Sequence, residues 1–389
     1  MWLTDRCCCA FCCAFLGPEY YSPIRSKRGM KVYACHRCGL VQSISTTPYV
    51  SRPPGNLSSD ADRSSYRYTK TLAHPGYTSF LDEIDWPSNP AILDVGSNRG
   101  VFADSILKLV SGAKVVCVEP DPFMESEVYA RDDVFLLRRR FEEISLEEDS
   151  FDLIFCAHTL EHAFSAPAML REFHKLLRPN GKLFIAVPNT ILYGDVVEEL
   201  FIDPHTFHFT YEVLVHLARA TGFQVSLSSD PGDHEIRLLL EKVNGVDDLP
   251  EVSGSSVFNL KQYSLTLGTN RRRLRDMCRR LEQGIGDGKL VVWGAGRLLD
   301  ALLVGGTLNT DRILGVVDSH LHRLTPSLRG LQVTSPDAIP LEWLEARLFV
   351  ASRDYSEEIK LQAEQIGFRE IETFVDLWRE SDSVSRNGK

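Results

Sequence analysis

The sequence predicts an α/β fold in which a Rossmann-like sheet is flanked by a small cysteine-rich N-terminal module and by a second, C-terminal Rossmann-like α/β domain. Two observations predict the sheets: short apolar runs at 91–95 and 289–293 each lead into a glycine-containing turn. A third predicts the module, because seven of the ten cysteines lie within the first 38 residues. With 389 residues the chain exceeds one typical domain.

The N-terminal cysteines form two Cys-x-x-Cys motifs, Cys9–Cys12 and Cys35–Cys38. Each motif places two sulfurs on one side of a tight turn, so two facing motifs can complete a tetrahedron of thiolates around one structural zinc ion. Such an ion would stabilise a segment too small to depend on a hydrophobic core alone. Other spacings remain open at the first motif through Cys7, Cys8 and Cys13. Unpaired cysteines and disulfides are the alternatives, although intracellular chains rarely keep disulfides.

The central sheet is predicted to begin with a strand at Ala91–Val95, a turn at Gly96–Gly100 and a helix at Val101–Val110. Glycines keep side chains out of the turn, so that a ligand can approach the backbone closely. A second buried strand at Val115–Val118 ends in Glu119, whose carboxylate can accept hydrogen bonds from both hydroxyls of a ribose. The turn and the carboxylate together predict a nucleoside-binding site.

Asp94 distinguishes this site from one that binds a dinucleotide. A dinucleotide motif reads Gly-x-Gly-x-x-Gly and holds phosphate at a helix N-terminus, whereas the pattern here is Asp-x-Gly-x-x-x-Gly. A carboxylate at Asp94 repels phosphate and suits a cation. S-adenosylmethionine carries a sulfonium and an ammonium group and no phosphate. We expect Glu119 to hold its ribose, and the turn to surround its methionine part through Asp94, Gly96, Ser97, Asn98 and Gly100.

The next buried strand, Ser150–Ala157, ends just before the segment His158–His162. Ligands bind at the carboxyl ends of parallel strands, so Ala157 and His158 are expected to line the cofactor site. The elements that follow are a helix at Ala168–Leu177, a turn at Arg178–Gly181 and a strand at Lys182–Val187.

From Ile92 to Asn189 this order of motifs resembles the core of class I S-adenosylmethionine-dependent methyltransferases. Many members of that family place an aspartate after the next strand to meet the adenine amine. Arg140 and Phe141 occupy that region here, so we expect Phe141 to stack on adenine. Helical residues over Tyr66–Ile84 are expected to cap the sheet.

A second strand–turn–helix start lies near the C-terminus. Lys289–Trp293 leads into Gly294–Gly296, and the strand Ile313–Val317 ends in Asp318. Leu299 stands where a third glycine is expected, which compromises close packing around a pyrophosphate. We expect a Rossmann-like domain that holds no dinucleotide.

The three parts in this order resemble the sugar C-methyltransferases of deoxysugar biosynthesis. The resemblance implies an acceptor carbon beside the ketone of a nucleotide-linked sugar, which the flanking domains help to hold. We expect four parts: a zinc-binding module and linker over 1–62, the S-adenosylmethionine-binding methyltransferase domain over 63–241, a linker over 242–258, and a helix with the C-terminal Rossmann-like domain over 259–389.

Methyl transfer is an in-line displacement at the sulfonium carbon, so it needs alignment and a nucleophile freed of its proton. Histidine suits this task because its unperturbed pKa is ~6.5. In the family's Tyr-His-Glu-His-like motif the second histidine corresponds to His205, but Pro204 stands at the glutamate position. Proline cannot take a proton, so either another group is the base or an oxygen or nitrogen is methylated. The candidate catalytic residues are His205, His158, His162 and Glu161.

The formal net charge of -10 argues against broad nucleic-acid binding, and no apolar run reaches the ~20 residues of a membrane helix. We expect a cytoplasmic enzyme, a monomer or homodimer, that acts on a small-molecule substrate. Two rival interpretations are a catalytically silent S-adenosylmethionine-binding or scaffold protein and an oxidoreductase that uses Gly294–Gly296. The intact Asp94 and Glu119 argue against the first, and Leu299 argues against the second.

Overall fold

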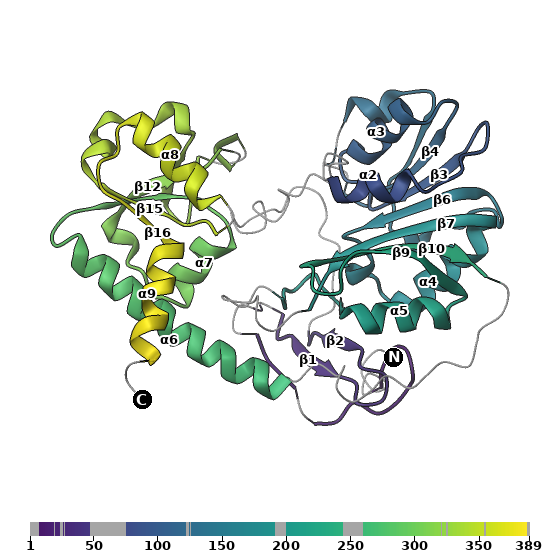
Figure 1. Cartoon of the computed structure of the whole chain (residues 1–389), viewed down its shortest axis with the longest axis horizontal. Coiled ribbons are helices and arrows are strands. Elements are labelled where there is room, and N and C mark those ends of the chain that lie inside the picture. The colour runs from purple at the N-terminus through teal and green to yellow at the C-terminus, as the bar shows by residue number, and fades with distance from the viewer. Residues whose placement is uncertain are drawn as a thin grey trace. The chain divides into compact units, whose positions relative to one another are not determined.

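The chain is described by a computed structural model, in which contacts define two compact units (Figure 1). The first contains the described residues up to Tyr263 and the second those from Ser264 onward. Residues 66–74 of the predicted helical segment and residues 244–258 of the predicted linker lie outside the described part. The structure describes residues 8–18, 20–23, 26, 28–46, 75–121, 124, 126–190, 200–243, 260–319, 321–323, 326–353 and 355–386.

A seven-stranded sheet forms the centre of the first unit, with the order β5-β4-β3-β6-β7-β10-β9. The strands from β5 to β7 run parallel, and β10 is antiparallel to both of its neighbours. This parallel core confirms the predicted α/β fold. The strands are β3 (Ala91–Val95), β4 (Lys114–Val118), β5 (Val134–Leu137), β6 (Phe151–Ala157), β7 (Leu177–Pro188), β9 (Phe223–Ser228) and β10 (Glu235–Lys242).

Two pairs of helices cover the two faces of this sheet (Figure 1). On one face, Phe102 stacks on Phe155 with ring centroids 3.6 Å apart, and Phe155 stacks on Phe184. On the other face, hydroxyls cap both helices, because Ser165 accepts from the Ala168 amide and Thr210 from the Val213 amide. The helices are α2 (Pro75–Leu81) and α3 (Val101–Leu109) on the first face, and α4 (Ala166–Leu176) and α5 (Tyr211–Ala220) on the second.

Residues 178–181, predicted as a turn, lie within β7 rather than before it. Phe151 pairs with Leu177 and Leu153 pairs with Lys182, so these four residues form an excursion in the strand. Asn180 has a φ of 69° there, a left-handed conformation that asparagine tolerates. The strand therefore starts at Leu177, earlier than predicted, because Leu177 already pairs with β6 before the excursion.

A small antiparallel sheet joins the N-terminal module to a later segment. Strands β1 (Lys31–Ala34) and β2 (Val41–Ile44) form a hairpin, and β8 (Phe207–His208) adds to β2. The Ser43 amide donates to the Thr206 carbonyl at 2.8 Å, and Ser43 Oγ lies 2.6 Å from His208 Nε2. The N-terminal module is thus joined by hydrogen bonds to the segment that follows His205.

The second unit contains a six-stranded sheet of order β13-β14-β12-β11-β15-β16, parallel except for β13. Helices α6, α7 and α9 share one core with the sheet, and α8 contributes to the core on the other face. The strands are β11 (Leu290–Trp293), β12 (Ile313–Val317), β13 (Ser327–Leu328), β14 (Leu331–Thr334), β15 (Arg347–Val350) and β16 (Ile371–Thr373). The helices are α6 (Leu260–Gly284), α7 (Arg297–Val304), α8 (Ser356–Ile366) and α9 (Phe374–Arg386).

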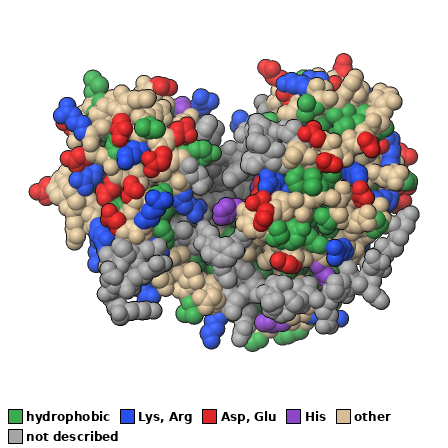
Figure 2. Space-filling view, viewed as in Figure 1, with side chains coloured by type: hydrophobic (Ala, Val, Ile, Leu, Met, Phe, Trp, Pro, Cys, Tyr) green, Lys and Arg blue, Asp and Glu red, His purple; other side chains and the backbone are tan. Residues whose placement is uncertain are grey.

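Acidic and basic side chains are interspersed over the face drawn in Figure 2, as a moderate net charge of -10 suggests. Among the described residues, no helix combines the length and the apolar character needed to cross a bilayer.

Candidate functional site

The predicted cofactor turn lies at the carboxyl end of β3. Asp94 is completely buried in the strand, and the chain then turns through three left-handed residues. Their φ angles are 71° at Gly96, 53° at Asn98 and 69° at Gly100, where α3 begins. Glycine and asparagine adopt this conformation more readily than other residues, so the sequence favours a sharp turn here.

Gly96 also allows close packing behind the turn. A Cβ at this position would lie 2.1 Å from Thr159 Oγ1, so the missing side chain lets the turn pack on the residues that follow β6. The Thr159 hydroxyl lies within hydrogen-bond distance of the Val95 and Ala157 carbonyls, at 3.1 and 3.0 Å. Gly96 therefore brings the ends of β3 and β6 together.

Glu119 ends β4 beside this turn and is 8% exposed. Its Oε2 accepts from the Asn98 amide and its Oε1 from the Asp121 amide, both at 2.8 Å. Ser97 Oγ lies 2.9 Å from the Tyr129 hydroxyl, which also donates to the Asn98 carbonyl. Backbone donors hold the carboxylate in a fixed position at the carboxyl end of β4.

Phe141 lies in the core of the domain. Its ring is 6% exposed and packs against Phe173 with ring centroids 4.9 Å apart, in the core cluster beneath α4 and α5. Core side chains thus cover most of the ring, and its stacking on adenine stays a prediction.

His158 follows β6 directly, after the buried Ala157, and has a φ of 50°. Its Nε2 lies 2.7 Å from Glu235 Oε2, and its Nδ1 lies 3.7 Å from Glu161 Oε1. Burial lowers the pKa of His158, but hydrogen bonds with Glu161 and Glu235 outweigh burial and raise it to about 9. The raised pKa favours the protonated imidazole at neutral pH.

Tyr77 of α2 completes this group. Its hydroxyl donates to Glu235 Oε2 at 3.1 Å and lies 3.4 Å from His158 Nε2. Burial, together with the nearby Glu235 carboxylate, raises the pKa of Tyr77, so the phenol keeps its proton. The neutral phenol of Tyr77 and the charged imidazole of His158 thus share the carboxylate of Glu235.

The other three predicted catalytic residues come together. Glu161 and His162 lie in a short 3-10 helix (Leu160–His162), and His205 comes from the loop before β8. Each side chain offers one possible ligand atom, a carboxylate oxygen or a ring nitrogen, and these three atoms all lie within 4.8 Å of one another. His162 Nδ1 is 3.0 Å from the Pro204 carbonyl, and the His162 and His205 ring centroids are 4.8 Å apart.

Backbone contacts fix this arrangement. The Thr206 amide donates to the Glu161 carbonyl at 2.8 Å, while the Thr206 carbonyl accepts from the Ser43 amide. Glu161 is 2% exposed; burial alone raises its pKa, but His158 and His162 reverse the shift and lower it. Glu161 is therefore a buried carboxylate.

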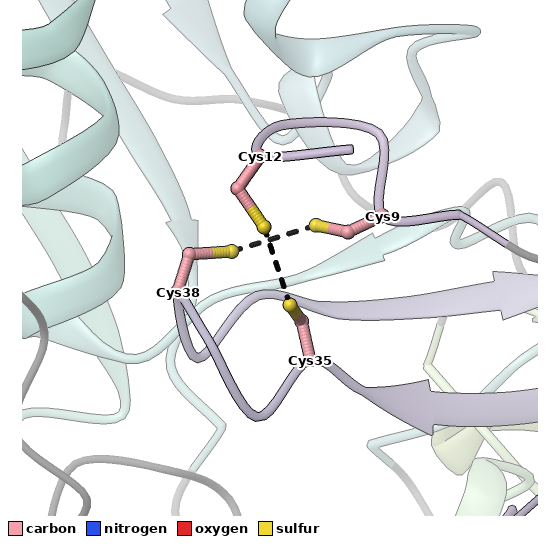
Figure 3. A group of neighbouring side chains, drawn as sticks. All are labelled: Cys9, Cys12, Cys35 and Cys38. Carbon is pink, nitrogen blue, oxygen red and sulfur yellow. Dashed lines mark hydrogen bonds between the residues drawn. The ribbon is translucent and has the colours of Figure 1, made fainter. Parts of the chain in front are cut away.

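The four predicted metal ligands lie together in the N-terminal module, with their sulfurs directed to one point (Figure 3). Cys9 Sγ is 3.4 Å from Cys38 Sγ, and Cys12 Sγ is 3.4 Å from Cys35 Sγ. Zinc–sulfur bonds of ~2.3 Å place tetrahedral ligands roughly 3.8 Å apart, so the cluster has suitable dimensions for zinc.

At the first motif, Cys9 and Cys12 are the cysteines that lie in the cluster. Cys8 and Cys13 are exposed, and Cys7 lies outside the described residues. The Gln42 side chain holds the motif because its Oε1 accepts from the Ala10 amide at 2.9 Å. Hydrogen bonds among the thiols lower the pKa of Cys35 and raise those of Cys9 and Cys38, so the cysteines titrate as one group.

Comparison with known proteins agrees with the cofactor geometry. Residues 68–227 match the family model described as "Methyltransferase domain". The first unit contains a class I S-adenosylmethionine-dependent methyltransferase domain. The parallel sheet and the acidic sheet edge belong to this domain.

Relatives match parts of this methyltransferase domain. The ubiquinone biosynthesis O-methyltransferase of Xanthomonas axonopodis pv. citri is 27% identical over 107 residues, which cover 26% of this chain and 45% of that protein. Its counterpart from Photobacterium profundum is 27% identical over 104 residues, covering 25% and 43%. The chain therefore spans less than half the length of either relative.

A solved structure, the 1,6-didemethyltoxoflavin-N1-methyltransferase of Burkholderia thailandensis, has a TM-score of 0.35 and 17% identity to this chain. That similarity covers 58% of this chain and 100% of the other.

The methyltransferase domain has donor groups that fit S-adenosylmethionine. Asp94 supplies a buried carboxylate, which suits the positive charges of the methionine part. Glu119 supplies a carboxylate held by two backbone amides, which suits a ribose. An acid that holds a ribose, such as Glu119, suits either kind of cofactor. A phosphate at the turn would instead meet the carboxylate of Asp94, so Asp94 is the residue that discriminates between the two kinds of cofactor.

In the second unit, Asp318 bridges two backbone segments. Its Oδ2 accepts from the Ala295 amide at 3.0 Å and its Oδ1 from the Leu321 amide at 2.7 Å. Leu299, at the position where a glycine was considered, is completely buried in the core. The carboxylate thus stabilises the glycine turn, and Leu299 joins the helix to the sheet.

Sequence reasoning missed two residues of the methyltransferase domain, Glu235 and Tyr129. Glu235 begins β10, and its acidic side chain precedes an apolar run, which was the only signal available. Tyr129 lies in a short 3-10 helix (Glu127–Ala130) after β4, and no motif marks it. Both act through partners that are distant in the sequence.

Proposed function

We propose that the chain transfers a methyl group from S-adenosylmethionine to a small-molecule acceptor. The observation that carries this proposal is the pair of buried carboxylates, Asp94 and Glu119, on either side of a left-handed turn at the carboxyl ends of β3 and β4. When bound, the cofactor supplies an electrophilic methyl group on a sulfonium. The residues of the chain bind and orient it beside the histidine group at the same sheet edge.

The proposed roles of the residues follow from their charges. Asp94 neutralises the positive methionine part, and Glu119 accepts hydrogen bonds from the ribose. His158 keeps its proton and, between Glu161 and Glu235, serves as a positioning residue. His205 and His162 lie beside Glu161 and face the acceptor.

The first experiment measures S-adenosylmethionine binding to the full chain by isothermal titration calorimetry. We expect binding by the wild type, and a loss of about tenfold or more in Glu119→Ala, because each hydrogen bond to a charged group contributes ~1.5–3 kcal/mol. Glu172→Ala is the matched control, since this glutamate pairs with Lys175 on the exposed surface of α4. Absence of binding by the wild type would remove the proposal.

For the acceptor, we propose a nucleotide-linked deoxysugar that is methylated at carbon, as the three-part resemblance implies. On this proposal the N-terminal module over 1–62 would bind zinc, and it and the part over 259–389 would hold the sugar nucleotide. The cysteine cluster supports the first of these roles.

Methylation of an oxygen is the second candidate. Pro204 offers only its carbonyl, which accepts from His162, in place of a carboxylate base. Both relatives reported above are named O-methyltransferases. A panel of nucleotide ketosugars and hydroxyl-bearing acceptors, with ¹³C-labelled cofactor, distinguishes the two because the methyl carbon resonates differently on carbon and on oxygen. Cofactor binding without transfer to any acceptor would favour a silent binding protein.

A further inference from the structure

We propose that Glu161, His162 and His205 form a binding site for a divalent transition-metal ion, to which an oxygen atom of the acceptor also binds. This inference rests on the proposed methyl transfer and adds the way in which the acceptor is recognised. The metal site is distinct from the four-cysteine cluster.

The first support is the set of ligand types and their separation. Two imidazoles and one carboxylate are the ligands that divalent zinc, iron and other first-row metals accept. Their ligand atoms all lie within 4.8 Å of one another. Metal bonds of ~2.0–2.2 Å place neighbouring ligand atoms roughly 3–3.5 Å apart, so binding draws the three side chains inward by about an ångström.

The second support is the orientation of His162. Its Nδ1 lies 3.0 Å from the Pro204 carbonyl, which can only accept, so Nδ1 carries the hydrogen. The lone pair then resides on Nε2, the nitrogen available to a metal. Metal-binding histidines usually donate their other nitrogen to a carbonyl or carboxylate in this way. Pro204, which lacks a side-chain base, thus contributes through its backbone.

The third support is Glu161. Its side chain is buried, and Oε1 faces His158 Nδ1 at 3.7 Å. Oε2 has no hydrogen-bond partner among the described residues. A buried oxygen without a donor is unfavourable, and a cation held between Glu161 and the two histidines offsets that cost.

Three protein ligands leave at least one coordination position for the acceptor. A metal-bound hydroxyl loses its proton to water more easily, because the cation stabilises the resulting oxyanion. That oxygen attacks the methyl carbon; a carbon–oxygen bond forms, and the carbon–sulfur bond breaks with its electron pair left on sulfur. For a ketone acceptor, a hydroxide ion removes the proton from the neighbouring carbon and becomes water, while the metal holds the enolate oxygen. The carbon then forms a bond to the methyl group as the carbon–sulfur bond breaks. In both cases the shared chemistry is an acceptor oxygen that gains negative charge.

The test uses the full chain with zinc retained in the cysteine cluster and Co²⁺ added as the probe. We expect one further equivalent of Co²⁺ by equilibrium dialysis with metal analysis. Its absorption spectrum should lack the intense near-ultraviolet charge transfer from thiolate to cobalt that a cysteine site produces. Glu161→Gln and His205→Asn should each weaken this binding by about tenfold or more.

His162→Gln supplies a further variant, since this side chain is more exposed than Glu161 and its loss is less damaging to the core. His322→Ala is the matched control. His322 Nδ1 also contacts a backbone carbonyl, that of Asp318, at 2.8 Å, but it lies in the second unit. Circular dichroism and S-adenosylmethionine affinity verify that each variant is folded.

Failure of this inference differs from failure of the proposed function. If S-adenosylmethionine binds but no Co²⁺ does, or if Co²⁺ binding is equal in all of these variants, the metal site is refuted and methyl transfer still stands. Charge transfer from thiolate in the bound cobalt would assign the ion to the cysteines and would equally overturn the site.

Discussion

At Gly96 a single added methyl group would meet the Thr159 hydroxyl at 2.1 Å, in a backbone conformation with a φ of 71°. We expect Gly96→Ala to lower the free energy of unfolding of the first unit by ~1–3 kcal/mol, because the strain and the collision add. S-adenosylmethionine should also bind more weakly. Urea unfolding and calorimetry measure the two effects.

Two variants separate strain from collision. Gly330→Ala introduces a side chain at a φ of 82° with no atom within 4 Å, so it measures strain alone. Adding Thr159→Ala to Gly96→Ala removes the colliding oxygen and should recover part of the loss. If the double variant is as unstable as Gly96→Ala alone, the backbone conformation and not the collision restricts position 96.

At the scale of elements, the pairing of β2 with β8 depends on a buried polar contact. Burial lowers the pKa of His208 to about 3, so its imidazole is neutral. Its Nε2 forms a hydrogen bond with Ser43 Oγ at 2.6 Å. Ser43→Ala leaves a buried ring nitrogen without that partner and should cost ~1–3 kcal/mol of unfolding free energy. Urea denaturation of the two proteins gives the difference.

Thr46→Ala is the control for this contact, because the Thr46 hydroxyl donates to the Arg28 carbonyl at an exposed position. It should change the free energy of unfolding by no more than about 0.5 kcal/mol. Equal losses in the two variants would contradict the importance of the buried contact.

Four strands of the central sheet, β3, β4, β6 and β7, were predictable because each contains a short apolar run. The predicted strand at Ala91–Val95 coincides with β3, and the strand ending at Val118 was placed one residue late at its start. The two-residue β8 was not predictable, since it forms only by pairing with β2. Local pattern determines a buried strand, whereas a short edge strand depends on its partner.

The site shows the same division. The turn from Gly96 and the acid Glu119 carry their signal in neighbouring residues, so their convergence was foreseen. The position of Phe141 was not, because sequence places a residue after a strand but does not say into which face of the sheet its ring turns. The contact of Glu235 with His158 likewise joins two strands that only the sheet order brings together.

At the scale of the whole chain, the proposed zinc ion should affect turnover more than cofactor binding. Cys9, Cys35 and Cys38 belong to the same core cluster as Phe207 and Phe209, which flank His208. Removal of the metal by Cys35→Ser should loosen the His205 loop. We expect methyl transfer to fall by about tenfold or more, equivalent to ~1.4 kcal/mol in the barrier.

In the same variant, S-adenosylmethionine affinity should change less than about threefold, because Asp94 and Glu119 belong to the central sheet. Cys13→Ser is the control, since this exposed cysteine lies outside the cluster and its variant should keep the metal. Full activity in zinc-free Cys35→Ser protein would disprove the coupling.

The pairing of β2 with β8 also sets an order of events during synthesis. Ser43 and His208 are 165 residues apart in the sequence. The cysteines can bind a metal while the ribosome is still producing the central sheet, but the small sheet gains its third strand only afterwards. Contacts at such separation slow folding. A chimera that exchanges the N-terminal module for another must therefore carry residues 205–208 with it, or the grafted hairpin will lack its third strand.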